Sequence, residues 1–356
     1  MLSLRNLFPA NKKAVGLDIG SSNIKLVDLQ DTANGCVLKS FAQVPMERGV
    51  IEGGLIKDHN ALVSKITEAF DESHCMAGNV VTALPGRAVM INKATFRKME
   101  DEELREFIID EAREYMPFDD IGDVNFDFHI CNNRESDSDQ IDVIIAAAKK
   151  SVIESYAYAI AKAGRKVTII DVDSFALETA YDENYDFDVT DTIALVNIGA
   201  SITNINIINN DESVFTRNIL LGGNSISETL QTNLGVSFDE AERIKTGDME
   251  KQDRIPGKLV DYLEPIFLEI GRTFDFFSST ANEPQINRIL VSGGCAGIQG
   301  VVDSMKQKFY CEAEIFNPFK NISCNRNVFS PSYITDIGFA AAAVAIGLAL
   351  RGIESR

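Results

Sequence analysis

A pattern that occurs twice in this sequence constrains its fold more than any other feature. In residues 14–29, AVGLDIGSSNIKLVDL, an apolar run ends at a glycine-containing turn and an alternating strand follows. Residues 192–208, TIALVNIGASITNINII, repeat that order. Internal repeats indicate architecture before any single motif does, and apolar runs joined by a short turn are typical of a β-hairpin. The repeat predicts two related α/β domains, each opening with a hairpin and facing the other across a cleft.

The chain is predicted to divide into five parts. Residues 79–163 contain their own strands and helices, after which KVTIIDV returns the chain to the first sheet, so this block is predicted to be an inserted αβ subdomain that docks a partner. The predicted segments are an N-terminal arm at 1–13, a first domain at 14–78 and 164–190, the inserted subdomain at 79–163, a second domain at 191–336, and a terminal helix at 337–356 packed on the first domain.

Composition excludes several classes of function. A net charge of -19 argues against nucleic-acid binding, which depends on Lys and Arg, and disfavours adhesion to anionic lipid. The six cysteines show no CxxC spacing, which favours free thiols over a metal site or a disulfide framework. The apolar run at 337–350 is shorter than the ~18 residues of a membrane span, and the run before Pro9 is too short for a secretory signal, so no direct membrane insertion is expected.

The first hairpin has the residues that a magnesium-bound polyphosphate requires. Small residues let backbone N–H groups approach phosphate oxygens, and a carboxylate can hold the hydrated metal. The turn supplies Gly20, Ser21, Ser22 and Asn23, with Asp18 before it and Lys25 after it. An ordinary hairpin turn would explain this segment almost as well on its own.

Three further segments strengthen that interpretation. The second hairpin, residues 197–203, repeats the small-residue turn, and LVSGGCAGIQG, residues 290–300, is a strand that runs into Gly-Gly and then a helix. Glu242 and Lys245 lie three apart on one predicted helix face, where both could reach ribose hydroxyls. Each segment alone has a structural explanation, respectively a turn, a strand-to-helix connection and a solvated helix.

Together these segments resemble the superfamily of actin, heat-shock chaperones and sugar kinases. Four other stretches, EELREFIIDEAREYMPFD, AAAKK, IIDVDSFALE and IGLALR, resemble the PilM family of type IV pilus assembly proteins and, more distantly, the cell-division protein FtsA. The resemblance covers nearly the whole chain. It implies an actin-like fold of two RNase H-like domains around a nucleotide cleft.

The resemblance also implies a role for individual residues. It assigns Asp18 to hydrated Mg²⁺, and it assigns Asp173 to the orientation of the attacking water. The residues implied to bind ATP or ADP are Gly20, Ser21, Ser22, Asn23 and Lys25 in the first hairpin, Asn197, Gly199, Ala200, Ser201 and Thr203 in the second, Glu242 and Lys245 at the ribose, and Gly293, Gly294 and Gly297 near the adenine. One departure is Asn197, where the superfamily has Asp, so ATP binding with slow or no hydrolysis is expected.

The family implies an ATP-bound cytoplasmic scaffold, held at the inner membrane by its partners. Its expected partner is the cytoplasmic N-terminal peptide of a PilN-like inner-membrane protein, in a groove between the inserted subdomain and the first sheet. Arg87, Tyr115 and Phe118 are candidates for that groove. Assembly or retraction ATPases, the platform protein and a second copy of the chain are further candidate partners. The alternatives are an FtsA-like cytoskeletal ATPase and a small-molecule kinase of the same superfamily.

Overall fold

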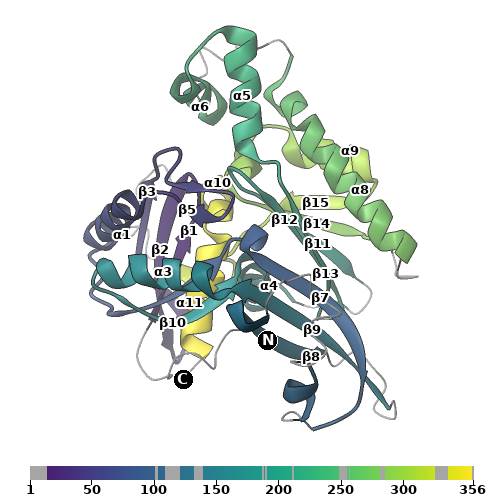
Figure 1. The fold of residues 1–356 in the computed structure, drawn as a ribbon. Coiled ribbons are helices and arrows are strands. Elements are labelled where there is room, and N and C mark those ends of the chain that lie inside the picture. Colours follow the sequence, from purple (N-terminus) through teal and green to yellow (C-terminus); the bar gives the residue numbers. More distant parts are fainter. Residues whose placement is uncertain are drawn as a thin grey trace. The chain divides into compact units, whose positions relative to one another are not determined.

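The computed structural model forms two compact units, each described by itself (Figure 1). It describes residues 14–100, 103–108, 121–131, 139–186, 188, 191–210, 212–247, 255, 257–280, 285–324 and 336–354. The first unit comprises residues 1–31, 39–179 and 347–356, and the second comprises residues 32–38 and 180–346. The predicted arm at 1–13 lies outside the described residues, and the five predicted boundaries stay a prediction.

The first unit is built on a mixed sheet in the order β10-β6-β1-β2-β3, with β16 added beyond β3. Its strands are β1 (Ala14–Ile19), β2 (Asn23–Thr32), β3 (Gly35–Pro45), β6 (Asn79–Leu84) and β10 (Lys166–Val172), and β4 (Ile51–Glu52) pairs with β5 (Leu55–Ile56) beside them. β1 pairs antiparallel with β2 and parallel with β6. β1 and β6 are apolar on both faces because helices cover both sides of the sheet. β16 (Ser323–Cys324) pairs with Val37 and Leu38, which belong to the second unit.

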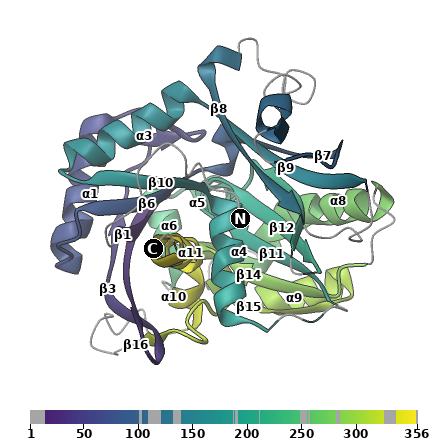
Figure 2. The same ribbon diagram turned by 90° about the horizontal axis from the view of Figure 1, so that it is seen from below.

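Helices α1 (His59–Ser73) and α3 (Lys150–Lys162) cover one face of this sheet, and α11 (Ala343–Glu354) covers the other (Figure 2). Asp58 caps α1 by accepting from the Ala61 N–H. On the opposite face, a Cβ at Gly347 would lie 1.6 Å from the Ala176 carbonyl oxygen. Only glycine therefore lets α11 pack this closely.

The block predicted to be an insertion has its own sheet. It consists of β7 (Val89–Arg97), β9 (Gln140–Lys149) and β8 (Val124–Cys131), with β9 in the centre and both pairings antiparallel. One face packs on Leu104 and Ile108, and the other packs Ile144 and Ala146 against Phe175 of α4 (Asp173–Asn184). This sheet is thus anchored to the first unit by its own buried contacts.

The second unit contains a five-stranded sheet in the order β13-β12-β11-β14-β15. Its strands are β11 (Thr192–Ile198), β12 (Thr203–Asn209), β13 (Glu212–Ile219), β14 (Arg288–Ser292) and β15 (Glu312–Ile315). Its helices are α5 (Gly223–Leu234), α6 (Phe238–Thr246), α8 (Glu264–Thr280), α9 (Val301–Phe309) and α10 (Asp336–Ala341). They bury one apolar cluster against β11, β12 and β14.

A 3-10 segment, η4 (Leu259–Leu263), leads into α8. The terminal helix predicted at 337–356 differs from the structure. The terminal apolar run forms two helices, α10 and α11, with a break at Ala342. The unit boundary falls inside α11 before Gly347 and inside α4 after Thr179. No helix among the described residues is long and apolar enough to cross a membrane.

Candidate functional site

The first hairpin is closed by an ion pair between its two strands. Asp18 of β1 lies opposite Lys25 of β2, and Lys25 Nζ donates to Asp18 Oδ2 at 2.9 Å. Both side chains are about 14% exposed. The turn itself is fixed by Gly20, whose N–H donates to the Asn23 carbonyl. The one predicted metal ligand of this unit therefore lies beside a cation that a phosphate group could attract.

Asp173 lies close enough to this pair to be affected by its charges. It is the first residue of α4, and its carboxyl group accepts the backbone N–H of Gly86. Burial, followed by the negative charge of Asp18, raises the pKa of Asp173 to about 8, against the opposing effect of Lys25. At neutral pH the carboxyl group is mostly protonated, and in that form it is a poor base.

The second hairpin repeats the first at each register position. Gly199 N–H donates to the Ile202 carbonyl as Gly20 does to Asn23, and Asn197 lies opposite Asn204 as Asp18 lies opposite Lys25. Both members of the ion pair are thus replaced by amides. Asn197 was predicted as the position that differs from the Asp of the superfamily. Asn204 was not predicted, because only the strand register places it opposite Asn197.

These amides form a continuous row across three strands. Asn197 Nδ2 donates to Asn204 Oδ1 at 3.3 Å, and Asn204 Nδ2 donates to Asn218 Oδ1 at 2.6 Å. Ser292 of β14 donates to Asn197 Oδ1 at 3.3 Å. Asn197 is therefore held through both its donor and its acceptor, and its side chain has a fixed orientation without any charge.

The start of α5 is bonded to the second turn. The N–H groups of Gly223 and Asn224 donate to the carbonyls of Gly199 and Ala200, and Asn224 Nδ2 donates to Ser201 Oγ. A Cβ at Gly222 would lie 2.5 Å from the Gly199 carbonyl oxygen, so this position requires glycine. Gly222 was not among the predicted site residues.

Glu242 and Lys245 form one cluster with α5. Lys245 Nζ contacts Glu242 Oε1 at 2.5 Å and donates to the Gly223 carbonyl at 3.1 Å, while Ser227 donates to Glu242. Lys245 is only 9% exposed, whereas Glu242 is 32% exposed. The lysine is fixed within the structure, and the carboxylate keeps a surface that a ribose hydroxyl could contact.

The third predicted segment adjoins this cluster. Gly293 has a positive φ of 87°, and η5 (Gly294–Gly297) follows it. A Cβ at Gly293 would lie 2.4 Å from the Ile198 carbonyl oxygen, whereas a Cβ at Gly294 would meet nothing within 4 Å. Gly294 thus leaves open space beside the backbone, which is what a flat base requires.

The predicted residues therefore fall into one group in each unit. Asp18, the first turn, Lys25 and Asp173 belong to the first unit, and the remainder belong to the second. Thr203 differs from the others because its hydroxyl is buried and donates to the Leu221 carbonyl. The hydroxyl proton of Thr203 is therefore already used and is not available to a phosphate, as its predicted role requires.

The residues present fit a magnesium nucleotide whose metal ion is held through water. Among the described residues no group of three or more His, Cys, Asp or Glu side chains could hold a metal ion. Asp18 is a single carboxylate, which suits contact through a water molecule but not direct chelation of the ion.

Of the peptide-groove candidates, only Arg87 is described. A Cβ at Gly53 would lie 3.2 Å from Arg87 Nη1, so Arg87 packs over the loop between β4 and β5. Tyr115 and Phe118 lie outside the described residues.

Comparison with known proteins identifies the family. The model of the family described as type IV pilus assembly protein PilM matches residues 16–353. The chain belongs to this family. A curated relative is the cell division protein FtsA of Bacillus subtilis (strain 168), which is 25% identical over 257 residues. That match covers 66% of this chain and 58% of FtsA, so the chain spans little more than half of that relative.

Solved structures confirm the predicted actin-like α/β fold. A PilM–PilN type IV pilus biogenesis complex has a chain with a TM-score of 0.84 and 25% identity, covering 97% of this chain and 99% of its own. The ethanolamine utilization protein EutJ of Carboxydothermus hydrogenoformans has a TM-score of 0.57 and 16% identity, covering 96% of this chain and 90% of its own. MreB5 of Spiroplasma citri, solved with AMPPNP, has a TM-score of 0.51 and 13% identity, covering 97% of this chain and 98% of its own.

Proposed function

We propose that this chain is an ATP-binding cytoplasmic scaffold of type IV pilus assembly that binds a short peptide of a PilN-like inner-membrane protein. The observation that supports this most strongly is the similarity over 97% of the chain to a chain of the PilM–PilN complex. In this proposal the partner holds the protein at the membrane, and the scaffold relays to the assembly or retraction ATPases and the platform protein.

The nucleotide would be held by the residues that the two hairpins and α6 provide. Lys25 and the backbone of both turns would bind phosphate oxygens, Asp18 would hold a hydrated Mg²⁺, and Glu242 would accept from the ribose. A bound Mg²⁺ would neutralise part of the phosphate charge. The similarity of the fold to MreB5, which was solved with AMPPNP, supports this assignment.

Hydrolysis is proposed to be slow for two physical reasons. Asn197 and Asn204 supply no carboxylate or cation at the second hairpin, so it contributes no fixed charge to the reacting phosphate. Asp173 is mostly protonated at neutral pH, so it cannot readily accept a proton from water. Such a site suits a nucleotide-dependent switch better than an engine.

The peptide is proposed to bind at the inserted three-stranded sheet, beside the first sheet. An extended peptide can pair with a sheet edge while a few apolar pockets select its side chains. The order β7-β9-β8 leaves β7 and β8 as edges, and the buried contacts of Ile144 and Ala146 with Phe175 hold this sheet on the first unit.

Calorimetric titration with the cytoplasmic N-terminal peptide of the PilN-like partner tests this function. We expect saturable one-to-one binding that differs in affinity between the ATP-bound and the nucleotide-free protein. A scrambled peptide of the same composition is the control. Equal heats from both peptides, or no binding of the native peptide, would refute the scaffold role.

The alternative FtsA-like role rests on the 25% identity with FtsA. Sedimentation of the ATP-bound protein distinguishes it: a cytoskeletal ATPase forms polymers that pellet, whereas the proposed scaffold stays in the supernatant. No observation favours the small-molecule kinase.

A further inference from the structure

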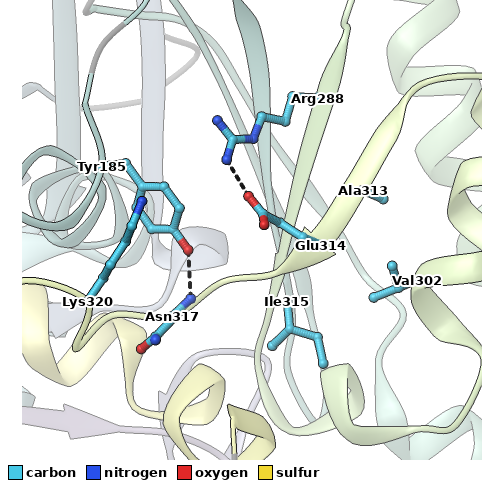
Figure 3. A pocket seen from close by; sticks show the side chains of 8 residues that line it. All are labelled: Tyr185, Arg288, Val302, Ala313, Glu314, Ile315, Asn317 and Lys320. Atoms are coloured by element: carbon cyan, nitrogen blue, oxygen red, sulfur yellow. Dashed lines mark hydrogen bonds and ion pairs between the residues drawn. The ribbon is translucent and has the colours of Figure 1, made fainter.

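The second unit contains a pocket of about 530 Å³ away from the residues assigned to the nucleotide (Figure 3). Tyr185, Asn317 and Lys320 lie on one side of it, Arg288 and Glu314 lie next to them, and Val302 with residues of β15 completes the wall. Its volume falls within the range of about 300–1,000 Å³ that is typical of ligand sites. None of its residues belongs to the predicted nucleotide site.

The pocket follows the open edge of β15. Its lining includes Ala313 and Ile315 from one face of this strand and Glu314 from the other. A hollow on one face of a sheet would take only alternate residues, because successive side chains point to opposite faces. The lining therefore wraps around the strand edge, and β15 is the last strand of its sheet.

The N–H groups of β15 alternate between the β14 side and the open edge, where Ala313 is buried and Ile315 is half-buried. The N–H groups of Glu312 and Phe316 donate to Asn287 and Val291 on the β14 side, so those of Ala313 and Ile315, at the alternate positions, point to the open side. Within the described part of the chain, neither of these N–H groups has a hydrogen-bond partner. The next outward N–H, that of Asn317, donates to the Tyr185 hydroxyl at 2.9 Å.

The charge at this edge is positive although the chain as a whole is strongly acidic. Lys320 Nζ lies 4.6 Å from the centroid of the Tyr185 ring, and Arg288 lies 5.7 Å from it. Arg288 is paired with Glu314, but Lys320 is exposed and has no ion pair with a described residue. One cation in the pocket lining is thus left uncompensated.

We propose that this edge is a second docking site, which binds an acidic segment of a partner protein in extended conformation. The segment adds as a strand to β15 through Ala313 and Ile315 and places a carboxylate at Lys320. Main-chain pairing of this kind gives affinity, and the pocket beside the strand gives selectivity. The short open edge, ended by Tyr185, admits only a few residues. The site is separate from the peptide site and the nucleotide residues proposed above.

Methyl NMR with two blocked pentapeptides tests the proposal. The acidic probe is Ac-Thr-Glu-Val-Glu-Thr-NH₂, and the neutral probe replaces both Glu residues with Gln. We expect the acidic probe to shift the methyl signals of Val302, Ala313 and Ile315 and the neutral probe to bind about tenfold more weakly, because a charged hydrogen bond is lost.

Two variants test the two parts of the site. Lys320→Glu removes the cation, and Ile315→Pro removes an outward N–H that the sheet does not use, so the edge keeps its pairing with β14. Each is expected to weaken the acidic probe by tenfold or more. Lys320→Glu should leave thermal unfolding close to that of the unmodified chain, whereas Ile315→Pro also loses apolar contacts with the core and should unfold at a somewhat lower temperature. Lys308→Glu makes the same charge change on α9, outside the pocket, and is expected to leave binding within about twofold.

Four results would overturn the proposal, and the first three concern the probes. These are the absence of shifts at millimolar probe, equal binding of both probes, and shifts that succinate reproduces at the same concentration, which would mean a small-anion site. A concentration-dependent dimer that Ile315→Pro dissociates would also overturn it, because a second copy would then be the occupant. Nucleotide and PilN-like peptide titrations are unaffected by these variants in our account, so failure here is distinguishable from failure of the proposed function.

Discussion

The two hairpins share one backbone design but differ in how their strands are joined beside the turn. In the first, Asp18 and Lys25 form a 2.9 Å ion pair, and in the second the same register positions are Asn197 and Asn204. In the proposed function, the first hairpin exchanges its internal ion pair for contacts with a metal and a phosphate. The second has no charge to exchange, and its amides are bonded to Asn218 and Ser292.

This difference teaches that a duplicated fold need not duplicate chemistry. The first hairpin keeps the charged groups that we propose bind a nucleotide, whereas the second keeps the geometry of the turn and has amides in their place. The second turn is also packed against other backbone segments, since Gly222 and Gly293 both lie against it. The first hairpin therefore has the charged pair, and the second has the closer packing around its turn.

The largest effect should come from breaking the packing of the second hairpin. Gly293→Ala would place a Cβ 2.4 Å from the Ile198 carbonyl oxygen at a φ of 87°. We expect a loss of about 2–4 kcal/mol in unfolding free energy, measured by urea titration. Gly294→Ala is the matched control, because its Cβ meets nothing within 4 Å and should change stability by less than about 0.5 kcal/mol. Equal losses in both variants would contradict the close-packing argument.

Removing the charge of the first hairpin should affect binding more than folding. Lys25→Met is expected to weaken ATP binding by about ten- to a hundredfold, because a charge-assisted hydrogen bond contributes about 1.5–3 kcal/mol. Calorimetry measures this, and Lys162→Met on the exposed end of α3 is the control. The pair Asp18→Asn with Lys25→Asn gives the first hairpin the amides of the second. If that double variant kept full affinity, the charge would have no role.

The reciprocal change should sharpen the comparison. Asn197→Asp removes the donor that faces Asn204 Oδ1 and is expected to reduce stability by about 1–2 kcal/mol. Adding Asn204→Lys should restore stability, because the ion pair of the first hairpin is then reproduced in the second. A phosphate-release assay should show faster turnover in the double variant. Unchanged turnover would mean that the amides are not what limits hydrolysis.

A pH dependence is expected in the first unit, which contains Asp173. Burial raises the pKa of Asp173 to about 8 in the folded protein, above its ordinary value of 3.8. The folded state thus binds this proton more tightly, so the stability that it contributes is complete below about pH 4 and is lost as the pH rises through 8. Relative to Asp173→Asn, the melting temperature of the unmodified chain should fall between pH 6 and pH 9. Parallel melting curves across that range would show that Asp173 does not titrate there.

Much of the fold follows from local sequence patterns. The strands β1 and β11 are apolar runs that end at a glycine turn, and that pattern is visible within a few residues of sequence. β15 escaped prediction because its four residues, EAEI, alternate as a strand does but are too few to identify one. The break between α10 and α11 also escaped it, since an alanine-rich run has no local signal that ends a helix.

The candidate site was predictable in its turns and not in its supports. Asn204 can be recognised as a site residue only from the register that places it opposite Asn197. Gly222 can be recognised only from its close approach to the Gly199 carbonyl. The pKa of Asp173 is raised because Asp173 is buried near Asp18, which lies 155 positions earlier in the sequence. Contacts of this kind arise from tertiary packing, which local pattern does not contain.

We propose that the charged first hairpin enables this member of the family to bind a nucleotide. Calorimetric titration of the purified chain with ATP and Mg²⁺, compared with the Asp18→Asn, Lys25→Asn double variant, tests it most directly. We predict saturable one-to-one binding by the unmodified chain and a loss of about tenfold or more in the variant. Absence of ATP binding by the unmodified chain, or identical affinity in both proteins, would contradict the account.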